Sequence, residues 1–111
     1  MNVLPIVLKG HLTGPALERA LETVTWSLEG KSDDCALVFD CLEMTGYDTE
    51  IRDIYITWHR RFKDRIKRVA VVTDRQLWRV VVSTVGLAVR GQVKTFNTLS
   101  PARSWAESSA S

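Results

Sequence analysis

The sequence has few of the residue types on which metal centres and many catalytic sites depend. Its 111 residues include two cysteines and two histidines. Cys35 and Cys41 lack the Cys-x-x-Cys spacing typical of zinc sites. No serine or cysteine stands in a nucleophile-elbow pattern, and no glycine-rich phosphate loop occurs. We therefore expect no catalytic residue, no metal and no cofactor, and hence a protein that is not an enzyme.

A large excess of one charge is also absent. Lysine and arginine total 15 against 13 aspartates and glutamates, which gives a formal net charge of +2. So small an excess does not favour a nucleic-acid partner. With 45% hydrophobic and 25% charged residues, the composition is typical of a folded domain and not of a disordered chain.

Long apolar segments are missing as well. The longest nearly uncharged stretch, residues 76–89, is interrupted by Arg79 and is too short to cross a bilayer. Residues 1–9 have no basic residue before their short apolar stretch and no small-residue cleavage site after it, so they do not resemble a signal peptide. We therefore expect no integral membrane segment and a cytoplasmic location.

The two cysteines stand at either end of an apolar run, residues 36–39. If this run is a strand, the α-carbons of Cys35 and Cys41 lie about 20 Å apart, which is too far for a disulfide. Both residues are expected to be ordinary thiols in or near the core.

Hydrophobic periodicity predicts strands that alternate with helices. The β-prone or continuously apolar runs that predict strands are residues 3–8, 35–39, 69–72 and 92–96. Helical spacing of apolar residues follows each run, and the second helix is expected over residues 49–64. Because parallel neighbours need a crossover helix, this order predicts a single α/β domain over residues 1–107, with a mostly parallel sheet of four to five strands and about four helices. Residues 108–111 are expected to form a flexible tail.

Several residues are expected to mark the ends of these elements. Those expected to accept hydrogen bonds at the helix N-termini are Thr13, Asp48, Thr73 or Asp74, and Ser100. Gly30 is expected to end the first helix and Asp40 the second strand, and residues 10–13 are expected to form a turn.

Residues 37–50, with the sequence LVFDCLEMTGYDTE, resemble the signature of STAS domains, in which a strand, a turn and an Asp-Ser-Ser-Gly-type motif open the next helix. Residues 10–13, GHLT, are similar to the Gly-x-Leu-Thr turn after the first strand of those domains. The second half of the chain is similar to the SpoIIAA-like branch of bacterial proteins, at residues 68–74, 93–96 and 102–105 and at Trp78. The resemblance extends over nearly the whole chain and implies a SpoIIAA-like, STAS-like fold.

The resemblance also implies a regulatory or protein-interaction module. In anti-sigma-factor antagonists of this kind, the second serine of the motif is a phosphorylated switch. The residues aligned with the motif are Asp48, Thr49, Glu50 and Ile51, so a glutamate occupies the switch position and the glycine is missing. A switch of that type lacks its serine here, although Thr49 retains a hydroxyl.

Asp48, Thr49 and Glu50 are the candidate surface for a protein partner. They open a predicted helix, where unpaired amides and the helix dipole favour negative charge. The alternative is ordinary capping by Asp48, with Glu50 in the first turn of the helix.

Tyr55, Trp58, Phe62 and Trp78 are the candidate pocket for a small apolar ligand, between helix and sheet. The SpoIIAA-like fold is related to that of CRAL-TRIO-type lipid-transfer domains, so the resemblance implies a carrier or sensor of a lipid-like molecule as the alternative function. Core packing is the other explanation, because an aromatic stripe at helical spacing usually faces the core.

Two further surfaces leave alternatives open. The third predicted helix has more apolar residues, over 80–89, than one buried face needs, which favours a homodimer. The basic stretch at residues 58–68, which includes His59, is either a solvated helix face or a docking patch for an acidic partner, a phosphate or an anionic membrane.

Overall fold

Strands and helices alternate throughout the computed structural model, which describes residues 2–30 and 33–108. In chain order the elements are β1 (Asn2–Leu12), α1 (Gly14–Glu29), β2 (Cys35–Tyr47), α2 (Ile51–Arg61), β3 (Ile66–Val72), α3 (Gln76–Val89), β4 (Val93–Phe96) and α4 (Leu99–Glu107). Neighbouring strands are all parallel, and their order in the sheet is β1-β2-β3-β4. The predicted α/β fold with a parallel sheet is confirmed, with four strands and four helices in the described residues.

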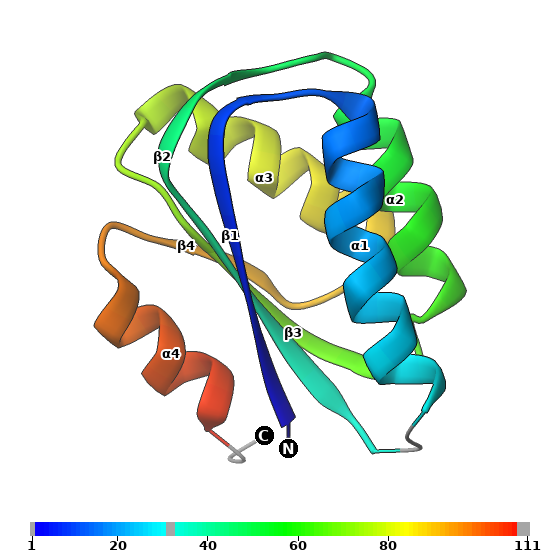
Figure 1. The fold of residues 1–111 in the computed structure, drawn as a ribbon. Helices are drawn as coiled ribbons and strands as arrows, with labels where there is room; N and C mark the ends of the chain where they lie inside the picture. The colour runs from blue at the N-terminus through cyan, green and yellow to red at the C-terminus, as the bar shows by residue number, and fades with distance from the viewer. Residues whose placement is uncertain (1, 31–32, 109–111) are drawn as a thin grey trace.

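The helices divide unequally between the two faces of the sheet (Figure 1). Each new strand is added on the same side of the previous one, so crossovers of one hand bring α1, α2 and α3 onto a single face. On the opposite face, α4 packs mainly on β3 and β2. The sheet therefore separates two hydrophobic clusters.

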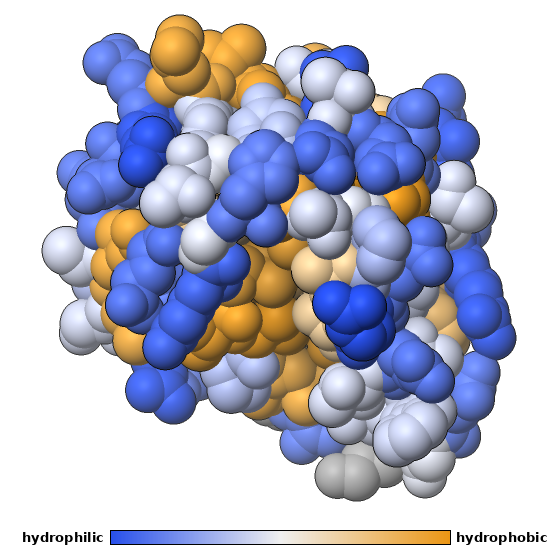
Figure 2. Space-filling model, turned by 45° about the horizontal axis from the view of Figure 1, so that its top comes forward, coloured by the Kyte–Doolittle hydropathy of each residue, from blue (hydrophilic) through white to orange (hydrophobic). Residues whose placement is uncertain are grey.

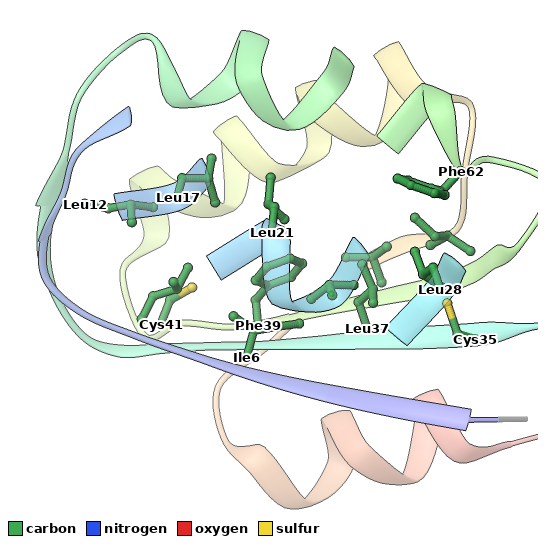
Figure 3. Close-up of a cluster of buried hydrophobic side chains, with 14 of the residues drawn as sticks. Ile6, Leu12, Leu17, Leu21, Leu28, Cys35, Leu37, Phe39, Cys41 and Phe62 are labelled. Atoms are coloured by element: carbon green, nitrogen blue, oxygen red, sulfur yellow. The ribbon is translucent and has the colours of Figure 1, made fainter. Parts of the chain in front are cut away.

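The larger cluster fills the space between the sheet and the three-helix layer. Leu17, Leu21 and Leu28 of α1 follow the helical period and share this cluster with Leu37 and Phe39 of β2 (Figure 3). All five side chains are buried. This packing confirms the apolar stripe that the sequence predicts for the first helix.

The smaller cluster lies under α4 and is built partly from alanines. Ala102 and Ala106 of α4 pack in it with Ala36 and Ala70 of the sheet. Because alanine adds only a methyl group, the helix backbone comes close to the strands. A short helix thus buries the centre of this face.

β1 and β2 are longer than the sequence predicts, and this difference shapes the candidate site. The predicted turn at residues 10–13 is wrong because β1 continues to Leu12, and Asp40 does not end β2, which continues to Tyr47. The strands stay paired through two register shifts, and Gly10 has a φ of 66°, which glycine adopts without strain. Such bulges bend a strand pair, and in Figure 1 the far ends of β1 and β2 arch toward α1 and α2.

The first helix begins and ends where the sequence predicts. Thr13 Oγ1 accepts a hydrogen bond of 3.2 Å from the Ala16 amide, and Pro15 lies in the first turn. Gly30 is the C-cap.

The N-caps predicted for the other three helices are wrong. The observed N-caps are Glu50, Arg75 and Thr98, and none of them makes a side-chain capping hydrogen bond. Asp48 binds His11 instead of capping α2, Thr73 and Asp74 precede the cap of α3, and Ser100 lies inside α4. The second helix is also shorter than the predicted 49–64, because its first turn starts only at residue 51 and its last residue is Arg61.

Other expectations concern the thiols, the membrane and the tail. Cys35 and Cys41 are both free and buried. Among the residues that the structure describes, no helix combines the length and the apolar character that a membrane span requires. Of the predicted tail, only Ser108 lies within the described residues.

Candidate functional site

A pocket of about 130 Å³ lies between the sheet and α3, where the arched ends of β1 and β2 meet the helical layer. Its strand residues are Leu8, Leu12, Phe39, Cys41, Met44, Tyr47, Val69, Val71 and Val93. Its other residues are Leu17, Ile51, Arg52, Tyr55, Thr73, Trp78, Val81, Val82 and Val85. Figure 2 looks onto this end of the molecule and shows an apolar area enclosed by hydrophilic side chains.

The pocket lies under the part of α3 whose residues are only partly buried. Only its last residue, Val89, is buried, and the helix packs chiefly on β4 and α2. At Gly86 the helix comes so close to β4 that an added Cβ would lie 3.2 Å from the Val93 Cβ. The half of α3 that carries Trp78 and Val82 leaves the sheet beneath it incompletely covered.

The pocket lining has almost no polar atoms that need a water molecule as a hydrogen-bond partner. Burial, and to a lesser extent the charge of Asp40, raises the pKa of the Cys41 thiol to about 12, so the thiol stays protonated. Thr73 Oγ1 already accepts a hydrogen bond of 3.2 Å from the Arg75 amide. A water molecule needs two to four polar partners to stay in a cavity, so this lining favours apolar contents.

Tyr55, which lines the pocket, forms a polar pair with the buried His59. The Tyr55 hydroxyl and His59 Nδ1 are 2.9 Å apart, and His59 is only 2% exposed. Burial lowers the pKa of His59 to about 4, and burial, followed by the effect of Cys35, raises the pKa of Tyr55. Both side chains are therefore neutral at pH 7 and fix each other's orientation.

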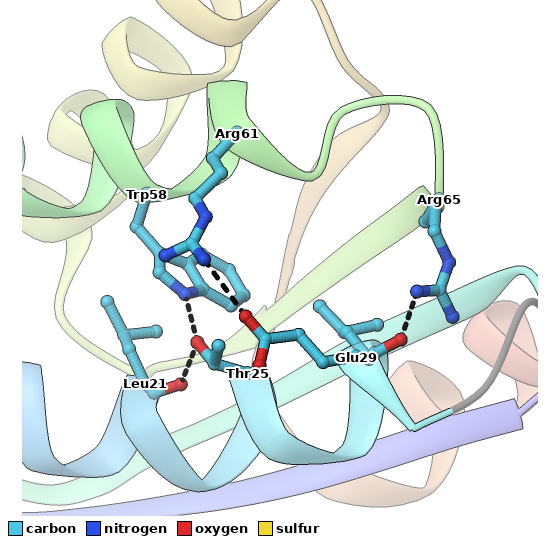
Figure 4. A network of polar contacts seen from close by, with 7 residues as sticks. Leu21, Thr25, Glu29, Trp58, Arg61 and Arg65 are labelled. Atoms are coloured by element: carbon cyan, nitrogen blue, oxygen red, sulfur yellow. Dashed lines mark hydrogen bonds and ion pairs between the residues drawn. The ribbon is translucent and has the colours of Figure 1, made fainter.

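The buried position of His59 contradicts its assignment to a solvated basic helix face. The arginines of residues 58–68 also bind within the fold: Arg61 pairs with Glu29 at 2.9 Å, and Arg65 bonds the Leu28 carbonyl (Figure 4). Arg60 donates to the Ala88 carbonyl at 3.1 Å. These contacts join α2 and the turn after it to α1 and α3.

The four aromatic residues predicted to form a pocket do not share one site. Tyr55 and Trp78 line the pocket, whereas Trp58 and Phe62 do not. The Trp58 indole N–H donates to Thr25 Oγ1 at 2.8 Å and faces a shallow groove between α1 and α2 (Figure 4). Phe62 packs on Trp58 with ring centroids 5.4 Å apart.

The sequence analysis missed most of the pocket wall, above all the end of β2. Cys41 and Met44 both face the helical layer, although residues three apart in a strand normally face opposite ways. The bulge that pairs Glu43 with Lys9 accounts for the change of phase. The alternation of buried and exposed residues that indicates a strand in a sequence is therefore interrupted at this point.

The three residues predicted to bind a protein partner lie beside the pocket, in the connection that precedes α2. Thr49 and Glu50 are exposed, and Asp48 Oδ1 lies 2.7 Å from His11 Nε2. The Glu50 carboxylate covers the start of α1, since a Cβ added to Gly14 would lie 2.7 Å from Glu50 Oε1. A carboxylate is favourable there because of the helix dipole.

Comparison with known proteins supports this fold. The model of the SpoIIAA-like family matches residues 3–107. Among solved structures, an uncharacterized protein from the DUF3478 family with a SpoIIAA-like fold, from Shewanella loihica PV-4, is similar, with 19% sequence identity and a TM-score of 0.74. The match covers 92% of this chain and 82% of that one, and at this identity it shows the fold alone. No curated protein matches the chain.

Proposed function

The chain belongs to the SpoIIAA-like family, and within this fold we propose that it is a non-enzymatic carrier or sensor that binds a small apolar molecule, or the apolar part of a larger one, beneath α3. The observation that carries the proposal is the pocket of about 130 Å³ with its nearly continuous apolar lining. An engineered cavity of about 150 Å³ with comparable walls stays dry and binds benzene. The pocket therefore suits a group of about that size.

The partial exposure of α3 supports the same proposal. A ligand must reach a pocket, and the helix above this one has a single buried residue, Val89, at its far end. Tyr47 and Trp78 meet edge to face over the pocket wall, with ring centroids 5.7 Å apart. A small displacement of the first turns of α3 would open this contact, and an apolar ligand would restore packing there.

The test compares two phenylalanine variants on opposite faces of α3. In Val82→Phe the larger ring fills the pocket, whereas in Val80→Phe it points to solvent, because Val80 is 63% exposed. Benzene is titrated into the isotope-labelled proteins while the Trp78 indole N–H signal is followed by NMR. We expect saturable shifts in the wild type and in Val80→Phe and at least about a tenfold weaker response in Val82→Phe. No saturable shift in the wild type, or equal binding by both variants, would contradict the proposal.

A second candidate function is a protein-interaction module that uses Asp48, Thr49 and Glu50. The observation in its favour is the exposure of Thr49 and Glu50 at the edge of the pocket, where a bound ligand would alter the surface that a partner meets. Charge reversal by Glu50→Lys is expected to abolish capture of the partner from host lysate, with the exposed Glu107→Lys on α4 as the control. Unchanged capture by Glu50→Lys would contradict a role for this surface.

A further inference from the structure

Resting on the proposed function, we infer that the ligand is a small amphiphilic carboxylate, whose apolar part fills the pocket and whose carboxylate is bound by Arg52 at the pocket mouth. Arg52 is the one charged residue among those that line the pocket, and its side chain is exposed. A residue that is both exposed and part of the lining lies where the pocket meets solvent. A ligand seated in the pocket would meet this guanidinium on its way out of the apolar space.

The guanidinium of Arg52 is available for this role. Within residues 2–30 and 33–108 it takes part in no hydrogen bond, ion pair or ring contact, in contrast to Arg60, Arg61 and Arg65 of the same region. Those arginines bind residues of other helices, so their guanidinium groups already have partners within the fold. The Arg52 charge has no such structural task.

The carboxylates nearest in sequence to Arg52 are directed elsewhere. Asp48 binds His11, Glu50 lies against the first turn of α1, and Asp53 lines the groove between α1 and α2. None of these three residues lines the pocket. A carboxylate on a ligand would therefore be the anion that completes this part of the site.

The chemistry of the mouth and the size of the pocket together define the ligand class. The planar guanidinium matches a carboxylate with two parallel N–H···O hydrogen bonds, and one arginine balances its single charge. A phosphate monoester near its second ionisation would leave about one charge unbalanced. The pocket volume of about 130 Å³ limits the apolar part to roughly the size of one aromatic ring. An arylacetate has this combination of properties.

The test uses three probes that share one ring. Phenylacetate, the neutral phenylacetamide and the cationic phenethylamine are titrated into the full chain at low salt and pH 7, with the Trp78 indole N–H signal as the readout. We expect the wild type to bind phenylacetate about tenfold more tightly than phenylacetamide and phenethylamine least tightly. In Arg52→Gln the preference for phenylacetate should fall to about onefold, while phenylacetamide still binds.

Arg103→Gln is the matched control, because Arg103 is exposed on α4 at the opposite face of the sheet. It should keep the wild-type preference. Equal binding of phenylacetate and phenylacetamide by the wild type would overturn the role of Arg52 and leave the apolar pocket standing. Failure of all three probes and of benzene to bind would overturn both proposals.

Discussion

At the scale of single residues, the most unusual environment is that of His59. A histidine followed by two arginines in the sequence would ordinarily be expected at the surface, yet it is 2% exposed and is bonded to Tyr55. The contact holds Tyr55, which lines the pocket. Protonation of His59 would place a charge inside the fold, which burial disfavours.

The stability of the protein should therefore decrease with acid in a way that depends on His59. Its pKa is about 4 in the folded chain and about 6.5 when unfolded, so the unfolded state binds more protons between these values. The stabilisation of the folded state by the neutral His59 is fully present above pH 6.5 and decreases as the pH falls toward 4. Between pH 7 and pH 5 the free energy of unfolding, measured with urea, should fall by about 2 kcal/mol more in the wild type than in His59→Gln. Parallel pH profiles would mean that the folded protein protonates His59 without penalty.

At the scale of elements, α3 carries apolar residues on its inner and its outer side. Its inner side lines the pocket, and its outer side presents Leu77 at 81%, Val80 at 63% and Leu87 at 81% exposure. These three residues lie within one face at helical spacing. Arg75 is the N-cap of this helix, Arg79 lies within it and Arg90 is its C-cap.

This outer face supports self-association through α3. We predict that sedimentation velocity will detect dimers of the wild type at high protein concentration, and that Leu77→Gln combined with Leu87→Gln will remain monomeric. Salt should not weaken the dimer, because the three residues of the contact are uncharged. The double variant should melt at the wild-type temperature, because both leucines are exposed. A wild type that is monomeric at every concentration would exclude this contact.

At the scale of the whole molecule, the site follows from the unequal distribution of helices. Three helices share one face of a sheet of four strands, and the last of them, α3, packs chiefly on β4 and α2. The gap under its first turns is closed from above by the arched ends of β1 and β2. The opposite face, closed by the small side chains of α4, contributes no residue to the pocket. The architecture thus concentrates loose packing at one end of one layer.

Most of the fold could be predicted from the sequence, because its signals are local. The helical stripe of Leu17, Leu21 and Leu28 and the apolar runs of β2 and β3 define amphipathic or buried elements whatever surrounds them. Thr13 caps its helix by accepting a hydrogen bond from the amide of Ala16, which is only three positions away. Because strands and helices alternate along the chain, a parallel sheet is the simple arrangement that satisfies the backbone hydrogen bonds of the strands.

The candidate site could be predicted only in part, because it depends on contacts between distant segments. Tyr55 and Trp78 were identified as aromatic candidates, but the same reasoning grouped them with Trp58 and Phe62, which lie outside the pocket. Which aromatic residue lines a space depends on how helices are placed over strands. Helical periodicity alone does not contain that placement.

By itself, the sequence determined the order of strands and helices, the parallel sheet and its core, since each follows from periodicity and chain connectivity. Only the tertiary structure decided the length of β1 and β2, the burial of His59 and the unpaired position of Arg52 at the pocket mouth. These features arise from pairing between residues far apart in the chain. The bulge that changes the phase of β2 and the burial of α3 at Val89 alone both result from packing. Packing therefore decides where this protein leaves room for a ligand.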